Sequence, residues 1–79
     1  MKFSELSMGQ QATIQSIATG DPAYRHKLMA MGLLPGTPFT VTRIAPLGDP
    51  IEITIRGFAL SLRRQEADLL ELSPVPSHG

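Results

Sequence analysis

The strongest constraint on the fold is the alternation of apolar and polar residues between positions 51 and 62. Apolar side chains stand at every second position on both sides of an Arg56-Gly57 pair: Ile51, Ile53, Ile55, Phe58, Leu60 and Leu62. Alternate side chains of a strand point to the same face of a sheet, and Arg56-Gly57 can form a two-residue turn. This turn places Ile55 opposite Phe58, so we predict a β-hairpin in which one register buries all six apolar side chains.

A first strand is predicted near the start of the chain, over residues 11–17. Ala12, Ile14 and Ser16 are small or apolar and alternate there with polar neighbours. This period of two is typical of a strand with one buried face.

Another strand is predicted over residues 39–44, with an irregularity in it. Phe39 and Val41 share a face, but continued alternation would turn Arg43 inward and Ile44 outward. We therefore expect a bend or bulge near Arg43. Bent strands of this kind allow a small sheet to close into a barrel.

A short helix is predicted between these two strands. Asp21 can accept hydrogen bonds from the free N–H groups of a first turn, and Pro22 fits the first helical position, which needs no N–H. Gly32 can end the helix in the left-handed conformation. Three side chains recur at helical spacing and are expected to face the core: Tyr24, Leu28 and Met31.

Two connections contain turn-forming residues. Pro35-Gly36 has the chemistry of a type II turn, because proline fixes φ at the first central position and glycine accepts a positive φ at the second. Pro46 and Pro50 lack the N–H groups that a central strand donates. Residues 45–50 are therefore expected to form a loop at one end of the sheet.

The last part of the chain completes the predicted architecture. Residues 65–68 are expected to form one helical turn, residues 69–72 a fifth strand and residues 73–79, which are rich in proline and serine, a flexible tail. A chain of 79 residues has room for one domain. We predict a mostly β fold over residues 1–72: a five-stranded SH3-like barrel with one short helix inserted between the first and second strands.

The residue types argue against an enzyme and against a metal site. The chain has no cysteine, and its two histidines, His26 and His78, are far apart in sequence. Asp49 and Glu52 could offer oxygen ligands, but a loop aspartate with a strand glutamate is more often a solvated pair. No serine has a histidine close to it in sequence, and no glycine-rich loop with lysine is present to hold phosphate. We expect neither catalytic residues nor a cofactor.

The charge and hydropathy of the chain also limit its partners. Seven basic and seven acidic side chains cancel, so no net field attracts nucleic acid. No stretch approaches the roughly 20 apolar residues that cross a bilayer. Contact with a membrane is therefore expected only through a partner protein, and the chain is expected in the cytoplasm.

A protein-binding surface is predicted around the end of the helix and the turn after it. The inner stripe of the helix already supplies core residues, so the other apolar side chains nearby cannot all be buried. The candidate residues, with two cations at their rim, are Arg25, Lys27, Met29, Leu33, Leu34 and Pro35. One alternative stays open here, in which Leu33 closes the end of the barrel and Leu34 packs on the turn.

Two blocks of the sequence resemble the FeoA family of small proteins. The first block is an Arg-x-x-Leu-x-x-Met-Gly-Leu-x-Pro-Gly pattern, matched by Arg25, Leu28, Met31, Gly32, Leu33, Pro35 and Gly36. The second is an Ala-Pro-Leu-Gly-Asp-Pro loop, matched by Ala45, Pro46, Leu47, Gly48, Asp49 and Pro50. With Gly57 in the hairpin turn, these glycines and prolines are expected to have structural roles. The resemblance covers nearly all of residues 3–72.

The resemblance implies a fold and a function. It implies an SH3-like domain that acts as a cytosolic accessory protein beside FeoB, the membrane protein that has a G-protein domain and transports iron(II). The chain would bind FeoB and support or regulate iron(II) transport, including its GTPase cycle. Other Feo proteins and a second copy of the chain are further candidate partners. Similar domains end iron-dependent repressors, so the alternative is a module that binds or responds to a transition metal.

Overall fold

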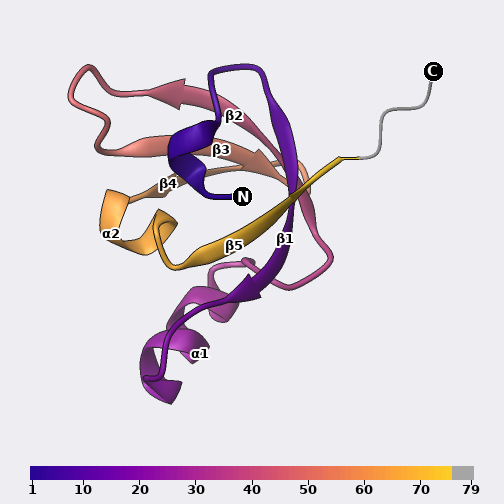
Figure 1. Cartoon of the computed structure of the whole chain (residues 1–79), viewed down its shortest axis with the longest axis vertical. Coiled ribbons are helices and arrows are strands. Elements are labelled where there is room, and N and C mark those ends of the chain that lie inside the picture. The colour runs from indigo at the N-terminus through magenta and orange to yellow at the C-terminus, as the bar shows by residue number, and fades with distance from the viewer. Residues whose placement is uncertain (76–79) are drawn as a thin grey trace.

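Five antiparallel strands form one sheet in the order β4-β3-β2-β1-β5 (Figure 1). The computed structural model describes residues 1–75. In chain order the elements are η1 (Phe3–Glu5), β1 (Gln11–Ile17), α1 (Pro22–Ala30), β2 (Pro38–Ile44), β3 (Ile51–Ile55), β4 (Phe58–Leu62), α2 (Arg64–Ala67) and β5 (Leu70–Pro74). The predicted five strands, and the helix between the first two, are confirmed. The predicted helical turn before the last strand is α2.

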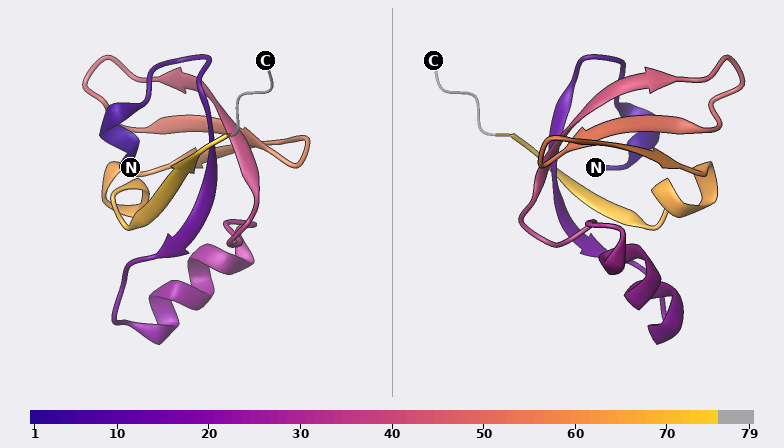
Figure 2. Two further views of the ribbon diagram at one scale, coloured as in Figure 1. Left: turned by 45° about the vertical axis from the view of Figure 1, so that its right-hand side comes forward. Right: turned by 180° about the vertical axis from the view of Figure 1, so that it is seen from behind.

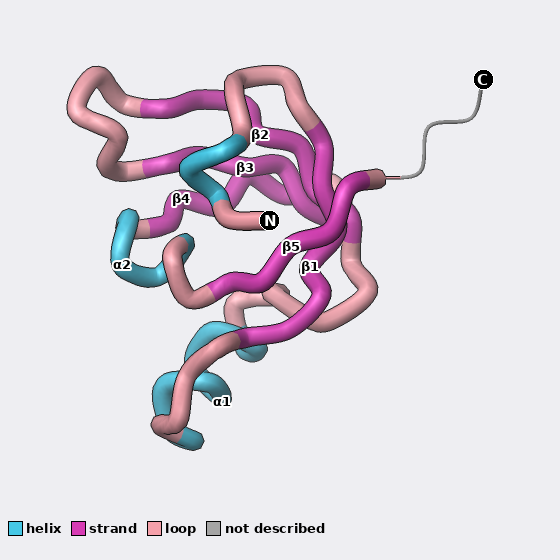
Figure 3. Tube along the Cα trace, viewed as in Figure 1, coloured by secondary structure: helices cyan, strands magenta, loops and turns pink. Residues whose placement is uncertain are grey.

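The sheet curls around a core to which every strand contributes. Figure 3 shows the strands wrapped around one interior, with α1 at one end of the molecule. The largest side chains that are fully buried are Ile14, Leu28, Leu33, Val41, Ile53, Leu62, Leu70 and Leu72. Each such side chain stabilises the fold by about 1.5–3 kcal/mol relative to an exposed position. In addition, Phe3 of η1 stacks on Phe39 of β2 with 5.2 Å between ring centroids.

Register shifts in two strand pairs explain which side chains face the core. The pairing of β2 with β3 shifts between Val41 and Arg43, which confirms the predicted irregularity. The shift leaves Arg43 exposed and returns Ile44 to the core, where it is half-buried. A second shift, between Ile14 and Ser16 of β1, was not predicted. Because of it Ser16 is exposed and Ile17 is buried, whereas the alternation had placed Ser16 with the apolar positions.

The hairpin of β3 and β4 has the predicted register but not the predicted burial. Ile55 pairs with Phe58 across a turn whose two residues, Arg56 and Gly57, have φ of 53° and 83°. However, Phe58 is 72% exposed and Leu60 is only half-buried, so the prediction that all six apolar side chains are buried is wrong. The reason is that β4 is an edge strand of the sheet and the end of the hairpin extends beyond the core (Figure 2).

The last strand is longer than predicted. Ser73 and Pro74 belong to β5 and lie opposite Thr13 and Ala12 of β1, so the strand continues two residues beyond its predicted end at residue 72. Backbone pairing with β1 extends the strand here, and no alternation of apolar side chains in residues 73–74 predicts this extension. Residues 76–79 of the predicted tail, including His78, lie outside the described residues.

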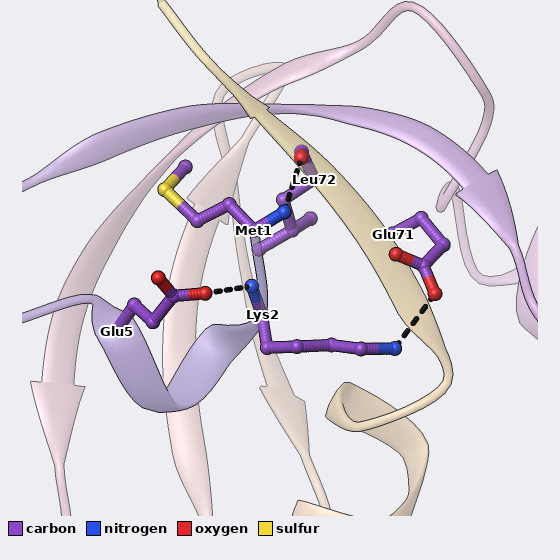
Figure 4. A network of polar contacts seen from close by, with 5 residues as sticks. All are labelled: Met1, Lys2, Glu5, Glu71 and Leu72. Carbon is purple, nitrogen blue, oxygen red and sulfur yellow. Dashed lines mark hydrogen bonds and ion pairs between the residues drawn. The ribbon is translucent and has the colours of Figure 1, made fainter.

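The start of the chain lies along the outer side of β5. The amino group of Met1 donates a hydrogen bond to the carbonyl oxygen of Leu72 at 3.1 Å (Figure 4). In return, the Leu72 N–H donates to the Met1 carbonyl oxygen at 3.0 Å. Next to these bonds, Lys2 Nζ forms an ion pair with Glu71 Oε1 at 2.7 Å. The backbone N–H of Lys2 donates to the Glu5 carboxylate at 2.7 Å. This network connects residues about 70 positions apart in the chain.

The ion pair gives a prediction about Glu71. The hydrogen bond and the charge of Lys2 lower the pKa of Glu71. A carboxyl group with a lowered pKa stabilises the fold above its unfolded pKa, and this contribution is lost as the pH falls through its folded pKa. We expect Lys2→Ala to raise the pKa of Glu71 toward its ordinary value, measured by an NMR titration of the carboxyl carbon. The control, Lys27→Ala, should leave it unchanged; equal shifts in both variants would contradict this prediction.

Candidate protein-binding surface

Helix α1, which contains most of the predicted contact residues, begins and ends where its sequence specifies. The Asp21 carboxylate accepts hydrogen bonds from the N–H groups of Ala23 at 3.0 Å and Tyr24 at 3.4 Å, and Pro22 is the first helical residue. Beyond the helix, Gly32 has a φ of 102°, the left-handed conformation that glycine adopts without steric cost. The predicted caps at both ends are confirmed.

The N-terminal cap gives a second prediction. Asp21→Ala removes the acceptor for two backbone N–H groups and should lower the free energy of unfolding by about 1 kcal/mol. Asp21→Ser keeps an acceptor at this position and should retain most of the stability. Urea denaturation of the two variants measures the difference. Equal stability of the alanine variant and the wild type would show that the cap contributes nothing.

The inner stripe of α1 is narrower than predicted. Leu28 is fully buried, as expected. Tyr24 and Met31 are half-buried and contact the core only from its margin. The short helix projects past the sheet, so its ends cannot bury their side chains as completely as its middle (Figure 2).

The two cations of the predicted surface lie on different sides of α1. Arg25 and Met29, one helical turn apart, line a shallow hollow of about 410 Å³ together with residues of the β1–α1 connection. There Arg25 Nη2 donates to the carbonyl oxygen of Thr19 at 2.9 Å. Lys27 points toward α2 instead: its Nζ lies 3.7 Å from the Glu66 carboxylate and 5.5 Å from the centroid of the Tyr24 ring. The structure therefore does not bring Arg25 and Lys27 together as one rim.

Leu33 is a core residue. Its side chain is fully buried, so the open alternative, in which it closes the end of the barrel, is the one found. Leu34 is half-buried and Pro35 is exposed in the turn that follows. This turn is held against β1, because the N–H of Gly36 donates to the carbonyl oxygen of Ile14 at 2.7 Å. Of the apolar residues predicted as contacts, Met29, Leu34 and Pro35 remain accessible.

A second hollow, with a more apolar lining, lies where the end of α1 faces the β3–β4 hairpin. A cleft of about 340 Å³, here called the hairpin cleft, is lined by Ala30, Met31, Gly32, Ile55, Arg56, Phe58 and Leu60. Phe58 is the most exposed of its large apolar side chains. Sequence reasoning missed Phe58 and Leu60 because their period of two placed them in the core. The sequence did contain a signal for their exposure, because both residues lie close to the turn, on a strand that could be at the edge of the sheet.

The second motif forms a tied loop with an exposed tip. The N–H of Gly48 donates to the Ala45 carbonyl oxygen at 2.7 Å, and the N–H of Ala45 donates to the Pro50 carbonyl oxygen at 3.1 Å. The Asp49 carboxylate accepts from the N–H of Arg64 at 3.2 Å, which connects the loop to α2. Leu47 stands at the tip and is 90% exposed. Residues 45–50 are a loop, as predicted, and hold an apolar side chain in solvent.

The ionisable side chains of residues 1–75 do not gather as a metal centre would require. No three of their His, Asp and Glu side chains lie close enough together to hold one ion. Glu66 is the one charged side chain that is buried within these residues, and its carboxylate accepts from the Arg63 N–H at 2.9 Å. No helix within them is long and apolar enough to cross a membrane.

Comparison with known proteins agrees with this fold and these motifs. The FeoA domain family model matches residues 1–74. The chain is 36% identical over 78 residues to the Fe(2+) transport protein A/Fe(2+) transporter FeoB fusion protein of Porphyromonas gingivalis; this match covers 99% of the chain and 9% of the fusion protein. It therefore spans only a small part of that relative.

Solved structures of FeoA proteins have the same architecture. The solution structure of FeoA from Chlorobium tepidum is 42% identical, with a TM-score of 0.85 over all of this chain and 74% of that one. FeoA of Stenotrophomonas maltophilia, described as a prokaryotic SH3 domain protein, is 22% identical and shares the fold with a TM-score of 0.77 over 92% of this chain and 89% of that one. The predicted SH3-like fold is confirmed. The chain belongs to the FeoA family, whose members are non-catalytic domains accessory to ferrous-iron transport.

Proposed function

We propose that this chain binds FeoB on the cytoplasmic side of the membrane and supports or regulates iron(II) uptake by it. One observation carries the proposal: a relative 36% identical to the chain is fused to FeoB in a single protein. Fusion holds two domains at a high effective concentration and so favours contact between them. We infer that the FeoA domain and FeoB associate also where they are separate proteins. The partner of a chain that is not fused would then be a separate FeoB protein.

The hairpin cleft has the features of a contact surface. Phe58 is an aromatic side chain held in solvent by a hairpin, and Met31 offers an adaptable apolar neighbour. Arg56 adds a cation at the margin of the cleft. Aromatic residues, methionine and arginine are enriched in protein interfaces. The exposed residues Met29, Pro35 and Leu47 lie outside the cleft and are secondary candidates.

The metal-responsive alternative has less support. Within residues 1–75 no three donor side chains come together to hold one ion. Of the acidic pair that the sequence suggested as oxygen ligands, Asp49 and Glu52, Asp49 already accepts a backbone hydrogen bond from Arg64. Binding to FeoB needs no metal ligand from this chain, and the exposed apolar cleft is a feature that metal binding would not explain.

A binding titration tests the proposed function. Purified chain is titrated against detergent-solubilised FeoB of the same organism, without nucleotide and with GTP. We expect saturable binding in at least one of the two states. A regulatory role in the GTPase cycle further predicts different affinities in the two states, because a ligand shifts an equilibrium only through differential affinity. Absence of binding in both states would overturn the proposal.

A further inference from the structure

The two edges of the sheet are not equivalent. The outer edge of β5 is covered by the start of the chain (Figure 4), where Met1 and Leu72 exchange two backbone hydrogen bonds. At the other edge, β4 pairs only with β3, and no further strand among residues 1–75 lies against it. An uncovered edge can pair with an added strand.

The register of the hairpin shows which backbone groups point outward. In an antiparallel pair, opposite residues alternate between pairs that exchange hydrogen bonds and pairs that do not. Ile55 and Phe58 close a two-residue turn and form a hydrogen-bonded pair, so the next such pair is Ile53 with Leu60. The N–H and carbonyl groups of Ala59 and Ser61 therefore point away from β3. These four groups can bond to another extended chain.

The side chains beside this edge suit an added strand. On the core side, Phe58 and Leu60 face the hairpin cleft, which Met31 borders from α1. On the outer side, Ala59 and Ser61 are small and exposed, and would not obstruct a neighbouring chain. Side chains of an added strand that alternate toward the cleft would bury Phe58.

The charges at the two ends of β4 have one sign. Arg56 precedes the strand and Arg63 follows it; both are exposed, and neither forms an ion pair within the described part of the chain. Arg56 also has a φ of 53°, a conformation that glycine or asparagine adopts at lower cost. An arginine at this turn position is unfavourable for the fold, which is consistent with a use for its charge.

We infer that β4 accepts an extended segment of FeoB as an added antiparallel strand. The segment would have apolar side chains at alternate positions, directed into the hairpin cleft, and carboxylates near its ends, directed at Arg56 and Arg63. Backbone hydrogen bonds at Ala59 and Ser61 would provide affinity, and the cleft and charges would provide specificity. This inference rests on the proposed function, because it names the part of FeoB that the chain recognises.

A second copy of this chain fits the same edge less well. Symmetric antiparallel pairing of two β4 strands through Ala59 and Ser61 would be centred on Leu60. The turn of each copy, with Arg56, would then lie close to the end of β4 of the other, which Arg63 follows. Like charges held close together repel each other. Charge complementarity therefore favours an acidic partner segment over self-association.

A proline substitution tests the inference. Ala59→Pro removes an N–H that points outward, which an edge strand tolerates, and so blocks an added strand while the fold is kept. The matched control Ala59→Thr keeps the N–H and favours a strand conformation. Both variants are titrated against detergent-solubilised FeoB of the same organism after their thermal unfolding has been compared with that of the wild type. We expect at least a tenfold loss of affinity for the proline variant and less than a threefold change for the threonine variant.

Hydrogen exchange of the wild type provides a second measurement that does not depend on any variant. In the free chain the amides of Ala59 and Ser61 should exchange rapidly, and in the FeoB complex they should become protected. If FeoB binds but these amides stay unprotected, or if Ala59→Pro binds as tightly as the wild type, the inference is overturned and the proposed function stands. If wild-type chain does not bind FeoB, both fail. A dimer in sedimentation analysis that Ala59→Pro abolishes would identify a second copy as the occupant and also overturn the inference.

Discussion

Replacing Leu33 by alanine is expected to lower the free energy of unfolding by about 2–5 kcal/mol. The side chain is fully buried, so its removal leaves a cavity in the core of a small domain. Such a loss is a large part of the roughly 5–15 kcal/mol that stabilises a typical domain. Chemical denaturation followed by circular dichroism measures it.

The matched control for Leu33 is a neighbouring apolar residue on the surface. Met29 is 37% exposed, and Met29→Ala should change the stability by less than about 1 kcal/mol. If the two variants were equally stable, the assignment of Leu33 to the core would be wrong. Leu33→Glu is expected to unfold the chain, because an unpaired carboxylate would be buried, so it cannot serve as a probe of binding.

Replacing Phe58 by serine is expected to weaken binding to FeoB at least tenfold while the stability changes little. The side chain is 72% exposed in the free chain, so folding gains little from it, whereas an aromatic side chain buried at an interface contributes strongly to affinity. The affinity is measured by titration and the stability by thermal unfolding. Unchanged affinity would exclude the hairpin cleft as the main contact.

The control for Phe58 is another exposed apolar residue, one that does not line the cleft. Met8 is 62% exposed in the turn before β1, and Met8→Ser removes a comparable apolar side chain from the surface. We expect its affinity for FeoB to match that of the wild type. An equal loss in the Met8 and Phe58 variants would show that general hydrophobicity, and not the cleft, governs binding.

Local sequence signals predicted the elements of this fold well. The caps at Asp21 and Gly32, the turn at Arg56-Gly57 and the irregularity near Arg43 each depend on a few neighbouring residues. Such features can be inferred from propensity and period because no distant contact is needed to form them.

Features that depend on distant contacts were predicted less well. The period of the hairpin cannot show how far the core extends beneath it, so Phe58 was assigned to the interior. The extension of β5 to Pro74 depends on pairing with Ala12, and the cover on its other edge depends on Met1. None of these pairings leaves a pattern within its own segment of the sequence.

The candidate surface was predicted only in part for the same reason. The sequence indicated surplus apolar residues near the end of the helix, and Met29, Leu34 and Pro35 are accessible there. However, the sequence leaves open whether Leu33 lies at this surface or in the core, and the structure places it in the core. The hairpin cleft combines two segments about 25 positions apart, and only the fold brings these together.

Site-specific photo-crosslinking tests the central claim, that the chain binds FeoB through the hairpin cleft, most directly. A photoreactive phenylalanine derivative replaces Phe58 in one sample and Met8 in another, and each chain is irradiated with detergent-solubilised FeoB. We expect a covalent product with FeoB from position 58 and none from position 8. A product from position 8 alone, or equal yields from both positions, would contradict the claim.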